Sequence, residues 1–168
     1  DNVTEFNTAV IKTAEKRGIP YTLDRITAAD LDELAAQGCE LLACAGYYYR
    51  APITDAFPMV NFHPTPLPVG RGSWPMPWLI LEGAKLGGVT AHKMAAEFDT
   101  GEILLRERFP LDEREDHQTY MEKVSERVPG MVHALIHNLS QVLENAQPQG
   151  AGEYWPLPAE KDWTVTPD

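Results

Sequence analysis

Apolar residues along the chain recur with two periods, one typical of helices and one typical of strands. They fall three or four positions apart over residues 4–17 and 27–38, and both segments stop at a glycine, so we expect a helix in each. Short apolar runs at residues 19–23, 41–45 and 59–63 are typical of strands. The run at 41–45 is continuous, which indicates a parallel strand covered on both faces.

The same alternation continues along the chain. We expect short helices at residues 51–57 and 75–83, and strands at residues 88–94 and 103–109. The early prolines of 75–83 are compatible with the first turn of a helix. Helices that alternate with strands in this way indicate an α/β fold.

A longer helical pattern covers residues 117–145 and contains the pair Pro129–Gly130, where we expect a break or a kink. The segment after it is rich in Pro, Gly and Trp and is expected to pack as an irregular tail. A chain of 168 residues is long enough for one domain with a real core and too short for two ordinary ones. We therefore expect a core at residues 1–146 and a tail at 147–168.

Composition narrows the choice of partners. The formal net charge is −11, which disfavours nucleic acid because a phosphate backbone needs a basic face. The two cysteines, Cys39 and Cys44, lie within one expected helix-to-strand passage and are expected to be reduced core thiols. No apolar run approaches the roughly 18 residues of a membrane span. We expect a cytoplasmic protein with no membrane partner and no metal.

Candidate chemistry begins where the expected strand at 59–63 stops. Alternate residues of a strand share a face, so Asn61 and His63 point the same way. Pro64 follows immediately and cannot extend a sheet ladder, so an amide and an imidazole stand together at a strand end. In open α/β sheets, ligands bind outside the carboxyl ends of the strands.

A carboxylate, Asp99, lies in the expected loop Phe-Asp-Thr-Gly between the last two expected strands. If the sheet brings it beside Asn61 and His63, the three groups suit acyl transfer to an amine. The amide would stabilise the oxyanion of a tetrahedral intermediate, worth about 10²–10³ in rate. The imidazole and the carboxylate would take the proton lost by the amine, worth about 10²–10⁴.

Four blocks of sequence strengthen this interpretation. They read N-F-H-P-T-P-L-P-x-G-R-G, P-W-x-I-L-x-G, G-V-T-x-H-K-M and F-D-T-G-E-I-L, in that order. Over roughly residues 5–145 the chain resembles the formyltransferases that use 10-formyltetrahydrofolate. The resemblance implies a Rossmann-like core with a mostly parallel sheet, in which Asn61, His63 and Asp99 are the catalytic residues. Thr65-Pro66 replaces the usual Ser-Leu of the family and keeps the hydroxyl of the loop.

The start of the chain departs from the family. Its core normally opens with a strand, a helix and a further strand before the part that resembles residues 4–18. We find no counterpart for these elements, so we expect an incomplete core, as in a fragment.

The resemblance also implies where the folate and the substrate bind. Thr65 and Arg71 are expected on the substrate side; Arg71 lies in a Gly-Arg-Gly turn and could meet an anionic group, or be an ordinary solvated arginine. The tyrosines near residue 47 could equally be packing aromatics at a strand end. The expected folate contacts are Tyr47, Tyr48, Ile53, Phe98, Thr100 and Gly101.

The amine acceptor is not fixed by the motifs. The family acts on initiator methionyl-tRNA, glycinamide ribonucleotide, amino sugars and natural-product amines. The acidic chain and its acidic tail favour a small-molecule amine over tRNA, which remains the alternative, and the oligomeric state stays open.

Three other interpretations are weaker. A single Asp-Thr-Gly would need a dimer to form an aspartic protease, and the helical pattern does not suit that all-β fold. A folate-binding module without turnover would retain the pocket and lose the chemistry. His133 and His137 are spaced to share a zinc ion on one helix face, but no third ligand is spaced to join them.

Overall fold

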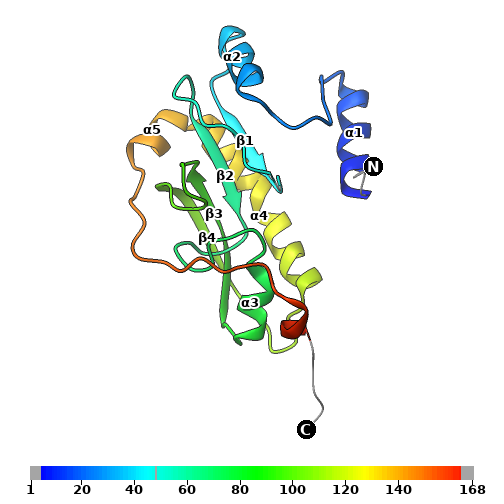
Figure 1. The fold of residues 1–168 in the computed structure, drawn as a ribbon, viewed down its shortest axis with the longest axis vertical. Helices are drawn as coiled ribbons and strands as arrows, with labels where there is room; N and C mark the ends of the chain where they lie inside the picture. The colour runs from blue at the N-terminus through cyan, green and yellow to red at the C-terminus, as the bar shows by residue number, and fades with distance from the viewer. Residues whose placement is uncertain (1–4, 48, 164–168) are drawn as a thin grey trace.

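The computed structural model describes residues 5–47 and 49–163. In chain order (Figure 1), the elements are α1 (Glu5–Arg17), α2 (Ala28–Ala36), β1 (Leu42–Ala45), β2 (Met59–His63), α3 (Met76–Leu81), β3 (Leu86–Lys93), β4 (Ile103–Pro110), α4 (His117–His137), α5 (Leu139–Glu144) and a terminal 3₁₀ turn (Glu160–Trp163). None of the helices in these ranges is long and apolar enough to cross a membrane.

The four strands form one sheet in the order β1-β2-β3-β4, and the α/β class is confirmed. The sheet is mixed where a mostly parallel one was expected: β1 and β2 are parallel, whereas β2–β3 and β3–β4 pair antiparallel. The loop 94–102 explains the antiparallel pairing of β3 with β4, because it is too short for the crossover connection that parallel strands need. The β2–β3 register places Asn61 opposite His92.

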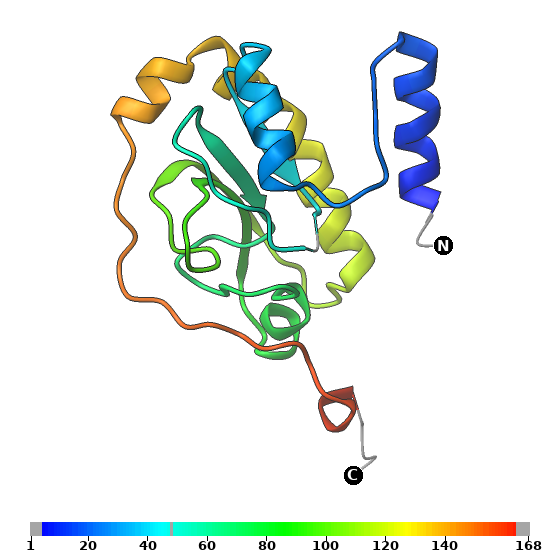
Figure 2. The same cartoon turned by 45° about the horizontal axis from the view of Figure 1, so that its top comes forward.

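The core lies between the sheet and α4, which runs along one face with α3 beside it (Figure 1). Tyr120, Val124, Met131 and Leu135 of α4 are buried there. On the other face α2 packs through Leu31 near β1. The expectation that β1 is covered on both faces is wrong, because its residues alternate between half-buried and exposed. In both ribbon views α1 stands apart from the sheet (Figures 1 and 2).

Most expected elements are present, but three expectations about secondary structure fail. Residues 19–23 and 51–57 adopt no regular structure. Of the break or kink expected at Pro129, the break does not occur: α4 continues to His137, because proline costs the helix one hydrogen bond while buried side chains on either side hold it to the sheet. The helix ends instead at Asn138, whose φ of −130° is not helical.

Helix starts follow the expected chemistry more closely. Thr27 caps α2 in a reciprocal capping box with Asp30. Asp116 and Thr119 make a second such box at the start of α4. These caps fix where both helices begin.

Beyond α5 the chain runs as an extended tail along the sheet loops towards α3, visible as the orange-to-red segment in Figure 2. It is attached through two isolated bridges, Gln147 with Ile103 and Tyr154 with Arg71. The second bridge brings the tail beside the loop that follows β2.

Candidate active site

Three elements bring the expected catalytic side chains together. Asn61 and His63 lie on one face of β2, and the turn from β3 to β4 returns Asp99 to them. Asp99 Oδ1 lies 3.4 Å from Asn61 Nδ2 and 3.5 Å from His63 Nδ1. The sheet therefore brings Asp99 beside Asn61 and His63, which the sequence alone could not establish.

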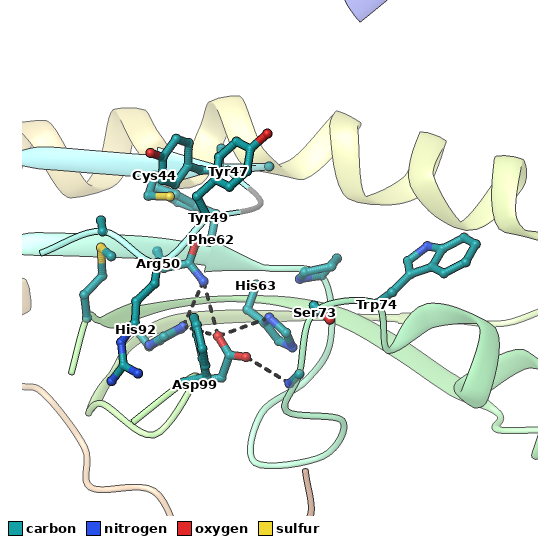
Figure 3. A pocket seen from close by; sticks show the side chains of 18 of the residues that line it. Cys44, Tyr47, Tyr49, Arg50, Phe62, His63, Ser73, Trp74, His92 and Asp99 are labelled. Carbon is teal, nitrogen blue, oxygen red and sulfur yellow. Dashed lines mark hydrogen bonds and ion pairs between the residues drawn. The ribbon is translucent and has the colours of Figure 1, made fainter. Parts of the chain in front are cut away.

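A fourth side chain, His92 of β3, completes the cluster. Its Nε2 lies 3.4 Å from Asp99 Oδ1 and 3.2 Å from Asn61 Nδ2. Figure 3 shows His63 and His92 on either side of the Asp99 carboxylate. The second carboxylate oxygen of Asp99 accepts a hydrogen bond from the backbone N–H of Gly72 at 2.9 Å. Asp99 thus has partners on both oxygens.

Backbone carbonyls determine where the imidazole protons lie, because a carbonyl can only accept. His92 Nδ1 lies 2.8 Å from the Lys93 carbonyl and donates to it, whereas Nε2 lies within reach of both the Asn61 amide and the Asp99 carboxylate. His63 Nε2 lies 2.7 Å from the Gly70 carbonyl and donates to it. In the neutral ring, His63 Nδ1 is therefore an unprotonated nitrogen that faces Asp99.

The charge states follow from burial. Burial lowers the pKa of the His63 imidazole below its ordinary 6.5, although the Asp99 carboxylate acts to raise it. Burial acts to raise the pKa of Asp99, but contact with the His92 ring, the charge interaction with His63 and the Gly72 N–H together bring it below its ordinary 3.8. At neutral pH the site holds an ionised carboxylate beside a neutral imidazole that can receive a proton.

The loop backbone around Asp99 is unusual. Asp99 is the one non-glycine residue with positive φ (56°) in the part of the chain that the structure describes. Two residues later Gly101 packs so closely against β3 that a Cβ there would collide with the Lys93 carbonyl. A strained turn held against a strand aims the carboxylate into the site.

A pocket of about 460 Å³ opens beside this cluster. Its floor contains Asn61, His63, His92 and Asp99, and the Val124–Pro129 stretch of α4 contributes an apolar wall. The opposite rim carries aromatic side chains: Tyr47 and Tyr49 lie together on one loop (Figure 3), with ring centroids 5.6 Å apart. The volume falls within the range of about 300–1,000 Å³ that suits a small organic ligand.

The expected folate contacts are only partly gathered at this pocket. Tyr47, Ile53 and Phe98 line it, and the Arg50 guanidinium lies over the Phe98 ring at 5.3 Å. Tyr48 lies outside the described residues. Thr100 and Gly101 do not line the pocket, since the Thr100 hydroxyl donates to the Glu97 carbonyl within its own loop.

The expected substrate contacts lie elsewhere. The Thr65 hydroxyl is buried and donates to the Val69 carbonyl at 2.7 Å, so it closes the proline loop. Arg71 points to the tail, where Nε and Nη2 both donate to Gln149 Oε1 at 3.2 and 2.9 Å. Neither residue lines the pocket.

Sequence reasoning missed two contributors. His92 was visible in the G-V-T-x-H-K-M block, but only the β2–β3 register places it opposite Asn61. Gln149 carried no signal, because it lies in the irregular tail and reaches the site only through the folded arrangement.

The spacing of His133 and His137 brings their rings into a stack at 3.9 Å. Within the described residues, no group of three or more His, Cys, Asp or Glu could hold a metal ion.

A family model described as formyl transferase matches residues 5–135. The chain belongs to the formyl transferase family. It is 32% identical over 149 residues to the methionyl-tRNA formyltransferase of Treponema denticola, covering 83% of this chain and 46% of that protein. The methionyl-tRNA formyltransferase of Fervidobacterium nodosum is 29% identical over 161 residues, covering 94% and 52%. The chain thus spans about half the length of these curated relatives.

Solved structures share the fold of this formyl transferase. HypX from Aquifex aeolicus, in complex with tetrahydrofolic acid, superposes with a TM-score of 0.71 at 23% identity, covering 82% of this chain and 25% of HypX. WlaRD, a sugar 3N-formyl transferase determined with dTDP and 5-N-formyl-THF, gives 0.69 at 20% identity, covering 92% and 54%. Methionyl-tRNA formyltransferase from Clostridium thermocellum gives 0.63 at 21%, covering 99% and 74%.

Proposed function

We propose that the chain transfers the formyl group of 10-formyltetrahydrofolate to a primary amine, with Asn61, His63 and Asp99 as its catalytic residues. The observation that carries this proposal is the cluster on the pocket floor, where Asp99 Oδ1 lies within 3.5 Å of Asn61 and His63. Membership of the formyl transferase family supports the reaction class.

Each side chain has a role that fits its surroundings. The Asn61 amide protons point to His92 and Asp99 over long contacts of 3.2 and 3.4 Å, so a modest rotation lets one of them donate to the formyl oxygen as negative charge develops there. His63 Nδ1 accepts the proton that the attacking amine loses and returns it to the tetrahydrofolate nitrogen, which leaves when the tetrahedral intermediate collapses and its C–N bond breaks. The resulting imidazolium would lie beside the ionised Asp99, whose charge stabilises it.

The pocket suits the formyl donor in size and character. Phe98, Ile53 and Tyr47 offer apolar and aromatic surface to a flat ring, and residues 94–97 of the loop before Phe98 also line the pocket. A folate bound there would place its formyl group at the floor, where the catalytic side chains lie. HypX and WlaRD were determined with folates, which agrees with this assignment.

Binding of the donor is tested by calorimetry with 5-formyltetrahydrofolate, a stable isomer. We expect saturable binding that weakens in Phe98→Ala and persists in His63→Ala, because His63 serves the chemistry rather than the affinity. Absence of binding to a folded chain would overturn the donor assignment. Binding without formyl transfer to any amine would favour a folate-binding module instead.

For the acceptor we propose a small-molecule amine such as an amino sugar. The net charge of −11 supports this choice, because tRNA affinity depends on cationic contacts to phosphates. A second candidate, methionyl-tRNA, is favoured by the 32% identity to the Treponema denticola enzyme over 83% of the chain.

Parallel assays of formyl transfer separate the two acceptors. Methionyl-tRNA and a panel of amino sugars are offered with the same 10-formyltetrahydrofolate, and the product is detected by mass. We expect turnover with an amino sugar that is insensitive to salt. Turnover with methionyl-tRNA that falls steeply as salt rises would establish the second candidate.

A further inference from the structure

The tail that follows α5 is hydrogen-bonded to the active-site loops through one side chain, Gln149. Gln149 Nε2 donates to the carbonyl of Asp99 at 2.9 Å and to that of Gly101 at 2.6 Å. These two carbonyls flank Thr100, so one amide group holds both sides of the turn that carries the catalytic carboxylate.

The orientation of this amide is fixed from its other end. Arg71 Nε and Nη2 both donate to Gln149 Oε1, and a guanidinium has no acceptor. The oxygen must therefore face Arg71, which leaves the NH₂ group to face the two carbonyls. Arg71 is further tied to the tail by Nη2 to the Gly150 carbonyl at 3.0 Å.

These contacts close a ring of hydrogen bonds around Asp99. Its carboxylate accepts from Gly72 N–H, and its carbonyl accepts from Gln149. Arg71 links Gly72 and Gln149, because it precedes Gly72 in the chain and its guanidinium donates to the Gln149 side chain. The same loop presents the Gly70 carbonyl to His63. One side chain thus links the supports of two catalytic residues.

The tail backbone holds Gln149 in place from both directions. Before it, Gln147 and Ile103 exchange backbone hydrogen bonds of 2.7 and 2.9 Å. After it, the Arg71 N–H donates to Glu153 and the Trp155 N–H donates to Arg71. The Trp155 ring packs against Gly70, where a Cβ would press on it at 3.0 Å. The amide is therefore preorganised before any ligand arrives.

We propose that Gln149 is a positioning residue for formyl transfer, which fixes the positive-φ turn at Asp99 and thereby sets the place of its carboxylate against His63 and Gly72. This inference rests on the proposed function for its effect on turnover, while its effect on geometry is independent of that function. The tail is accordingly a working part of the active site.

Two substitutions test the role. Gln149→Glu keeps an oxygen for Arg71 but replaces the NH₂ donor with a second oxygen, which repels both carbonyls. Gln149→Ala removes both contacts and is the gentler change if the first destabilises the fold. The matched control is Gln147→Ala, because that exposed amide lies two residues away and donates to the Asn145 carbonyl, not to the turn at Asp99.

The decisive measurement needs no substrate. The Gly72 amide resonance and the His63 imidazole titration are followed by NMR, with Asp99→Ala as the reference for a lost carboxylate. Asp99 and His92 are the titratable groups that face His63, and loss of the nearby carboxylate lowers its pKa. We expect both Gln149 variants to move both signals towards the Asp99→Ala positions, and Gln147→Ala to match the wild type.

Turnover supplies the second readout. We expect kcat to fall about tenfold or more in Gln149→Glu, since a misplacement near 1 Å can cost about a hundredfold, with KM changing less than kcat. Unchanged NMR signals in a folded Gln149→Ala chain would overturn the positioning role. Shifted signals in a chain that shows no formyl transfer even as wild type would keep the positioning role and reject the proposed function.

Discussion

The two sides of the pocket differ in how tightly they are built. On the floor, His63, His92 and Asp99 are 4%, 2% and 9% exposed. On the rim, Ile53 and Phe98 are 46% and 51% exposed. Residues that handle a proton must be held in position, because small displacements cost rate, whereas a rim that contacts a flat ring can adjust on binding.

The difference also appears in the contacts. The floor is held by cross-strand register and by backbone groups on two loops, so each side chain has several partners. The rim has weaker ties: Arg50 donates to the Ala96 carbonyl and lies over Phe98, and Arg25 lies over Tyr49 at 3.9 Å. We therefore expect floor substitutions to change kcat and rim substitutions to change affinity.

The largest effect is expected from the floor. Asn61→Ala, His63→Ala and Asp99→Asn should each lower kcat by at least about a hundredfold, since each removes oxyanion or proton-transfer assistance. Steady-state kinetics measure the loss, and circular dichroism checks the fold.

Matched controls are Asn145→Ala and His137→Ala, which remove the same side-chain types from exposed positions away from the pocket. Near-wild-type kcat in either the Asn61 or the His63 variant would remove the proposed mechanism. Wild-type kcat in Asp99→Asn would reduce Asp99 to a loop-forming residue.

A smaller but diagnostic effect is expected from pH. His63 must be neutral to accept a proton, so kcat should be constant above its pKa and fall as pH drops through it. Burial lowers this pKa, which places the acid limb below 6.5. Because the Asp99 charge acts to raise the same pKa, the residual activity of Asp99→Asn should show a limb at still lower pH. A wild-type limb at or above 6.5 would mean that another group accepts the proton.

On the rim, Phe98→Ala should weaken 5-formyltetrahydrofolate binding about tenfold while kcat changes little, since truncation removes apolar contact without touching the proton path. Calorimetry gives the affinity and saturating kinetics give kcat. Ile136→Ala, which truncates another exposed apolar side chain outside the pocket lining, is the control. A fall in kcat comparable to that of His63→Ala would erase the distinction between floor and rim.

The smallest effect is expected from Tyr47→Phe. It removes the hydroxyl that accepts from the Ile26 N–H at 3.2 Å but keeps the ring at the pocket. Chemical denaturation should show a loss of no more than about 1 kcal/mol in unfolding free energy, and folate affinity should stay nearly unchanged. A large loss of affinity would show that the hydroxyl, rather than the ring, meets the ligand.

Local sequence accounts for much of the fold. The capping pair Thr27–Asp30 set the start of α2, and the apolar run before His63 gave the strand whose end carries the site. Local signals failed where tertiary packing outweighs them. Pro129 did not break α4 because buried neighbours hold the helix on the sheet, and residues 51–57 formed no helix despite their expected short pattern.

The sequence by itself determined the fold class and the family resemblance, and it named Asn61, His63 and Asp99 as candidate catalytic residues, because these depend on residue types and spacing along the chain. Only the tertiary structure decided which groups meet: His92 opposite Asn61 by antiparallel register, and Gln149 against Asp99 by the path of the tail. It also shows that the Arg71 guanidinium donates to Gln149 of the tail and does not line the pocket. The physical reason is that hydrogen bonds and burial depend on distances in space, and residues 50 positions apart in the chain acquire such distances only on folding.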